Sequence, residues 1–91
     1  MKQVTMNEYK MQSRIDSLTE RGFCVEAANI QLWFDDLPGL ALHKFDELPT
    51  DKVDSLWSRL YNVIDYGPMS MLDVRQQLVR ELVAFEADNL R

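Results

Sequence analysis

Cys24 and His43 are the two side chains of this sequence that could act together as a nucleophile and its general base. Each is the single copy of its residue type, and no local motif surrounds either one. Cys24 is flanked by Phe23 and Val25, a setting typical of an inert, buried thiol. His43 falls in a segment that we expect to be a surface helix. We therefore predict no catalytic residues and no enzymatic activity.

Metal and cofactor binding also lack the necessary residues. One cysteine and one histidine cannot complete a zinc site, and the acidic pairs Asp35-Asp36 and Asp46-Glu47 lack the spacing of a calcium-binding loop. The three glycines are scattered instead of gathered into a phosphate-binding loop, and each suits the end of a helix. We expect no metal and no cofactor.

The charge balance argues against direct nucleic-acid binding. Fifteen acidic residues against ten basic ones give a net charge of −5, whereas a phosphate backbone attracts a basic surface. A helix-turn-helix made from the first two expected helices fails as well, because the second carries Glu26, Asp35 and Asp36 and no basic residue. No apolar stretch approaches the roughly 18 to 20 residues of a membrane span, and no signal core follows Lys2. A cytoplasmic protein without membrane contact is expected.

Length and composition fit one small helical domain over residues 1–91. The 46% of hydrophobic residues is enough to form a core, and apolar spacing predicts an all-α fold, a compact bundle of four or five helices. A chain of this size buries only about 60 to 65% of its unfolded surface. Association with another chain would therefore stabilise it.

Two helices have clear start signals. Thr5 and Glu8 form a capping box before a helix predicted near residues 6–21. Ser70 similarly caps a last helix predicted near residues 71–88. In both places a side-chain oxygen can accept from a backbone N–H that has no partner within the helix.

The local pattern in the middle of the chain predicts three further elements. Gly22 suits the left-handed position after the first helix. Residues 23–37 are apolar around the whole circumference of a helix, which indicates a central, buried helix, although a pair of short strands also fits these runs. Residues 40–48 are predicted to form a short helix or a structured turn. Thr50 opens another helix, with apolar steps of three and four.

The last helix carries more apolar surface than one core-facing stripe. At 100° per residue its apolar side chains cover an arc of about 180°. A small bundle should leave part of that arc exposed. Arg75 and Glu86 project into the middle of the arc, symmetrically about a point between Arg80 and Glu81. The apolar members of the arc are Met71, Leu72, Val74, Leu78, Val79, Leu82, Val83, Phe85 and Leu90.

This symmetry suggests a homodimer. If two copies of the helix pack antiparallel about a two-fold axis, Arg75 of each meets Glu86 of the other. In the alternative, both charged side chains lie at the edges of their own core, with their aliphatic stems on apolar neighbours. In either case the wide apolar arc predicts a site for a protein partner.

The predicted function is a non-enzymatic protein-interaction module, such as a small adaptor, inhibitor or subunit. Its site is expected to combine the last helix with nearby acidic residues. Aromatic residues are enriched in binding hot spots, so Tyr66 is included and Trp33 is a further candidate. The alternative is an acidic nucleic-acid mimic that inhibits a DNA- or RNA-binding protein. The predicted partner-binding residues are Tyr66, Leu72, Arg75, Val79, Val83, Glu86, Asp35, Asp36, Asp46 and Glu47.

Overall fold

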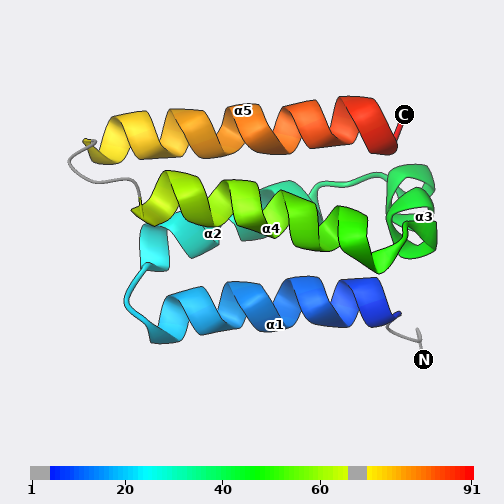
Figure 1. The fold of residues 1–91 in the computed structure, drawn as a ribbon, viewed down its shortest axis with the longest axis horizontal. Coiled ribbons are helices and arrows are strands. Elements are labelled where there is room, and N and C mark those ends of the chain that lie inside the picture. Colours follow the sequence, from blue (N-terminus) through cyan, green and yellow to red (C-terminus); the bar gives the residue numbers. More distant parts are fainter. Residues whose placement is uncertain (1–4, 66–69) are drawn as a thin grey trace.

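The computed structural model describes residues 5–65 and 70–91, and it folds them into α-helices joined by short connections (Figure 1). No strand forms within these two ranges, so the helical interpretation of residues 23–37 is confirmed. The five helices confirm the all-α bundle expected from the sequence. They are α1 (Met6–Glu20), α2 (Cys24–Asp35), α3 (Gly39–Glu47), α4 (Thr50–Asp65) and α5 (Met71–Asn89).

Four of the helices lie side by side, and α3 covers one end of the bundle (Figure 1). α2 packs extensively against both α1 and α5, and α5 also packs against α4. α1 and α4 touch over a shorter stretch. α2 and α5 run in the same direction, opposite to α1 and α4 (Figure 1). The pair α2 and α5 therefore forms a surface of two parallel helices.

The helix ends form where local sequence signals predict them. The hydroxyl of Thr5 accepts from the backbone N–H of Glu8, whose carboxylate accepts from the backbone N–H of Thr5 at 3.1 Å. Ser70 accepts from the backbone N–H of Asp73 at 3.2 Å. Gly22 has a φ of 93°, the left-handed conformation that ends α1. All three predictions are confirmed.

The core is centred on large side chains from every helix. Phe45 of α3 lies between Phe34 of α2 and Phe85 of α5, in edge-to-face contacts with ring centroids 5.6 and 6.5 Å apart. Trp33 meets the other side of this aromatic group at 6.3 Å from Phe85. These contacts fix α3 against α2 and α5. The largest fully buried side chains are Trp57, Phe45, Met11, Leu18, Ile30, Leu56, Leu60, Leu78, Leu82 and Val53.

α2 is not the central helix that its composition suggests. Ala27 and Ile30 face the core, but Val25 is 41% exposed and Leu32 is 62% exposed. The prediction of central burial is wrong because α2 lies between α1 and α5 and no described element covers its outer side. The buried-thiol prediction is wrong for the same reason, since Cys24 begins α2 and is exposed.

Asn7 joins the start of α1 to the end of α3. Its side chain is buried, and its amide donates to the carbonyl oxygens of Phe45 at 2.8 Å and Leu48 at 2.9 Å. Carbonyls at a helix C-terminus lack partners within the helix, so the amide supplies bonds that the α-helix itself cannot. The hydroxyl of Thr5 also donates to the carboxylate of Asp46 at 2.7 Å. The first turn of α1 thus holds α3 across the end of the bundle.

Candidate protein-binding face

The outer side of α5 carries an apolar stripe. Leu72, Val79 and Val83 are 63%, 48% and 48% exposed, and their spacing of seven and four places them on one side of the helix. Part of the apolar arc therefore stays exposed, as expected from the sequence. The core-facing side of the same helix carries Val74, Leu78, Leu82 and Phe85.

A second apolar stripe on α2 borders the first. Val25 and Leu32 are seven residues apart, so they share one side of α2, and Asn29 lies between them on that side. Asn29 lines a shallow depression of about 560 Å³ together with residues of α5. The depression therefore reaches from Leu72 and Val79 of the α5 stripe to Asn29 on the α2 stripe. The α5 residues that line it are Leu72, Arg75, Gln76, Val79 and Arg80.

We call this surface the α2/α5 face. It combines five exposed apolar side chains with one amide and one guanidinium group, and it belongs to two helices that pack directly against each other. Contiguous apolar surface of this kind is uncommon on a monomeric protein and is typical of interaction sites. The face consists of Val25, Asn29, Leu32, Leu72, Arg75, Val79 and Val83.

Opposite charges stand near the two ends of the face. Arg75 is exposed and forms no hydrogen bond or ion pair with any described residue. Glu86, eleven residues later, is partly buried; one carboxylate oxygen accepts from the indole N–H of Trp33 at 3.1 Å, and the other lies 4.0 Å from the guanidinium of Arg91. Glu86 therefore lies against α2, while Arg75 projects beside the apolar stripe of α5.

The acidic residues predicted for the site do not form one cluster of free carboxylates. Asp35 accepts from the amide of Gln31 at 2.9 Å, whereas Asp36 is exposed and has no partner among the described residues. Asp46 accepts from Thr5, as described above. The carboxylate of Glu47 lies 3.1 Å from the imidazole of His43. Tyr66 lies outside the described residues.

The structure does not bring Cys24 and His43 together. Cys24 begins α2 at one end of the bundle, and His43 belongs to α3 at the other end (Figure 1). Within residues 5–65 and 70–91, no group of three or more His, Cys, Asp or Glu side chains is placed to hold a metal ion. In the same ranges, no helix is both long and apolar enough to cross a bilayer.

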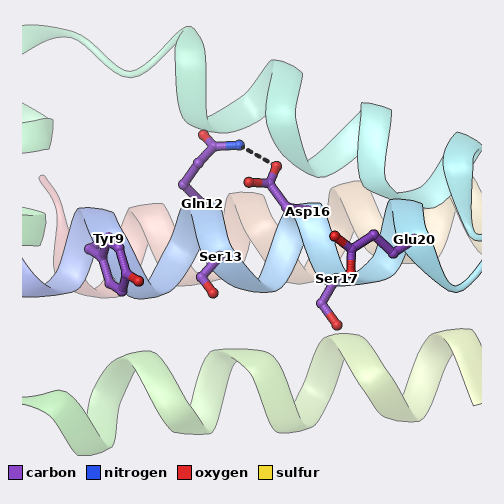
Figure 2. Close-up of a pocket in the computed structure, with 6 residues that line it drawn as sticks. All are labelled: Tyr9, Gln12, Ser13, Asp16, Ser17 and Glu20. Atoms are coloured by element: carbon purple, nitrogen blue, oxygen red, sulfur yellow. Dashed lines mark hydrogen bonds between the residues drawn. The ribbon is translucent and has the colours of Figure 1, made fainter.

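A hollow on α1 offers a different kind of surface. It has a volume of about 360 Å³, and all of its lining residues belong to this one helix. Figure 2 shows these side chains, with the amide of Gln12 donating to the carboxylate of Asp16 at 3.0 Å. Gln12 also exchanges two amide hydrogen bonds with Gln31 of α2, at 2.7 and 3.1 Å, so part of this polar set serves the α1–α2 contact. The lining residues are Tyr9, Gln12, Ser13, Asp16, Ser17 and Glu20.

No protein-family model, curated protein or solved structure matches the chain. What the α2/α5 face can bind therefore follows from its own residues. Three of these residues, Val25, Asn29 and Leu32, were not predicted from the sequence. The pattern of α2 gives no signal for them, because a helix that is apolar on all sides does not indicate which side its neighbours leave uncovered.

Proposed function

We propose that this protein is a non-enzymatic protein-interaction module that binds an amphipathic helical element of a protein through its α2/α5 face. The observation that carries the proposal is the exposure of five apolar side chains on two adjacent helices, two of which, Leu72 and Val79, line one depression together with Asn29 of α2. The two helices are parallel and packed against each other, so their exposed apolar side chains share one side of the bundle, and an apolar helix side can pack on them through anchors one and two turns apart.

The available apolar surface sets the expected strength of binding. Each of the five side chains has about half of its surface still to bury, which contributes on the order of 1 kcal/mol per residue. A partner surface of similar composition would double the total to about 10 kcal/mol. Loss of translational and rotational freedom costs at least about 4 kcal/mol. At this lowest cost, about 6 kcal/mol remains, which corresponds to a dissociation constant of tens of micromolar as the tightest binding expected.

A photo-crosslinking amino acid at Leu32 tests the proposal in the native host cell. Leu32 is on α2, so the partner can be blocked independently from α5 by the substitution Val79→Lys. We expect the chain that carries only the crosslinker at Leu32 to form an adduct of discrete mass. The chain that carries Val79→Lys in addition should form no such adduct.

The matched control is Ser13→Lys, which adds the same charge at an exposed position of α1 and should leave the adduct unchanged. A crosslinker placed at Ser17 reports on the α1 surface and should give no adduct of that mass. Absence of any adduct from Leu32, or an adduct that persists with Val79→Lys, contradicts the proposed function.

The acidic-mimic alternative has less support in the contacts. Three of the four carboxylates predicted for the acidic region, those of Asp35, Asp46 and Glu47, already contact other side chains of this protein. Salt distinguishes the two functions, because charge-driven binding weakens steeply between low and moderate ionic strength and apolar docking responds little.

A further inference from the structure

We infer that the helical element bound by the α2/α5 face is the same face of a second copy of this chain, related by a two-fold axis. This inference rests on the proposed function and names its partner. A two-fold interface must be self-complementary: each residue at a given distance on one side of the axis meets its counterpart at the same distance on the other.

On α5, two pairs of residues share one centre. Arg75 and Glu86 have their midpoint between residues 80 and 81, and Val79 and Val83 have theirs at residue 81. A two-fold axis that crosses α5 at this level makes the two copies of the helix antiparallel. It brings Val79 onto the partner's Val83 and Arg75 towards the partner's Glu86, so that apolar contacts lie at the centre and opposite charges at both ends.

On α2, the centre can be found independently of the α5 pairs. The hydrogen bond between Trp33 and Glu86 shows that these residues lie near the same level of the two helices, which run parallel (Figure 1). Residue 81 lies five positions before Glu86, and the same step along α2 from Trp33 leads to residue 28. The midpoint of Val25 and Leu32 is 28.5. The axis deduced from α5 therefore also brings Val25 close to the partner's Leu32.

Charges at the ends of α2 agree with the same arrangement. The antiparallel pairing sets the C-terminal end of α2, with Asp36, against the N-terminal end of the partner's α2. That end carries the exposed Arg21 in the preceding turn, and its N-cap, Phe23, makes no side-chain hydrogen bond to the first turn. Carboxylates are favoured both beside a guanidinium and at a helix N-terminus.

A small homodimer would need a modest share of the surface of this chain. A stable interface of standard size buries about 800 Å² on each partner. The chain exposes 5831 Å² in total, so about one seventh of its surface is required.

Mixing two charge variants tests the geometry. In a dimer of the Arg75→Glu variant, a carboxylate would face a carboxylate at both contacts between positions 75 and 86. In a dimer of the Glu86→Arg variant, a guanidinium would face a guanidinium at both contacts. We expect each variant alone to associate about tenfold more weakly than the natural chain, or worse, in sedimentation equilibrium. An equimolar mixture should recover the natural dimer to within about threefold, because both pairs in the mixed dimer are complementary.

Lys52→Glu is the matched control, since it makes the same charge change at an exposed position of α4 and should leave association unchanged. Glu86→Arg also removes the acceptor of Trp33, so a second measurement uses cysteines in a Cys24→Ser background. Val79→Cys mixed with Val83→Cys should form a disulfide-linked dimer faster than either variant alone, and Ser13→Cys should not.

The outcomes separate this inference from the proposed function. A natural chain that stays monomeric at about 1 mM, more than tenfold above the tightest dissociation constant expected, overturns the dimer. So does a mixture that associates no better than its components. If the Leu32 adduct in cells then has the mass of a different protein, the proposed function stands without the dimer. An adduct with the mass of two copies supports both.

Discussion

The substitution Asn7→Ala should destabilise this protein far more than its position in the second residue of a helix suggests. The amide of Asn7 bridges to two carbonyls that lie 38 and 41 residues further along the chain. Truncation to alanine removes both hydrogen bonds at once, together with a longer one to the carbonyl of Asp46 at 3.4 Å. The carbonyl of Phe45 keeps one partner, the backbone N–H of Leu48 at 3.2 Å, whereas the carbonyl of Leu48 is left without a described donor.

The magnitude follows from these two consequences. Each lost hydrogen bond costs about 1 kcal/mol net, and a carbonyl left unpaired in a partly buried setting costs about another 1 kcal/mol. Alanine regains up to about 0.7 kcal/mol through its higher helix propensity. We therefore expect the free energy of unfolding to fall by about 2 kcal/mol. With a urea m-value of about 1 to 2 kcal/mol per molar, the midpoint should fall by about 1 to 2 M.

Asn62→Ala is the matched control. It makes the same chemical change at an exposed position inside α4, where the asparagine has no hydrogen bond to a described residue. Only the propensity difference remains, so this variant should be as stable as the natural chain or more stable by up to about 0.7 kcal/mol. Urea unfolding followed by circular dichroism, at one fixed protein concentration, measures both. If the two variants differ by less than about 0.5 kcal/mol, the bridging role assigned to Asn7 is refuted.

Two further predictions concern the glycines and the cysteine. Gly22→Ala forces a side chain into a left-handed conformation and should lower the free energy of unfolding by about 1 kcal/mol. Gly39→Ala should be neutral or stabilising, because Gly39 begins α3 with ordinary backbone angles and open space around it. Thermal unfolding of both variants checks this difference, and equal effects would contradict the left-handed assignment of Gly22. Cys24 is exposed, so the native protein should react with a thiol reagent such as 5,5′-dithiobis(2-nitrobenzoic acid) at nearly the rate of the urea-unfolded chain, and protection by a large factor would show that the thiol is covered.

The features that sequence analysis predicted correctly depend on neighbouring residues. The capping box of Thr5 and Glu8, the cap at Ser70 and the left-handed Gly22 each act within one turn of helix. The apolar steps of three and four likewise set which side of α4 faces inwards. Such local signals are sufficient for element type and approximate bounds.

What sequence analysis missed depends on which elements meet. The exposure of Leu32 follows from the placement of α2 between α1 and α5, and nothing in the apolar pattern of α2 specifies that placement. The hydrogen bond from Trp33 to Glu86 joins residues 53 positions apart. For this reason the sequence indicated the symmetry of Arg75 and Glu86 but not the contact of Glu86 with α2.

The bridge from the first turn of α1 to the last turn of α3 also affects local unfolding of the protein and the choice of a site for attached tags. Because Thr5 and Asn7 close a loop of about forty residues, fraying of the amino-terminal turn releases the end of α3 at the same time. Amide protons of residues 45–48 should then exchange with solvent through the same opening event as those of the first turn. Purification tags and fluorescent labels are better attached after Arg91 than before the amino-terminal turn, where a bulky fusion would strain two distant helices together.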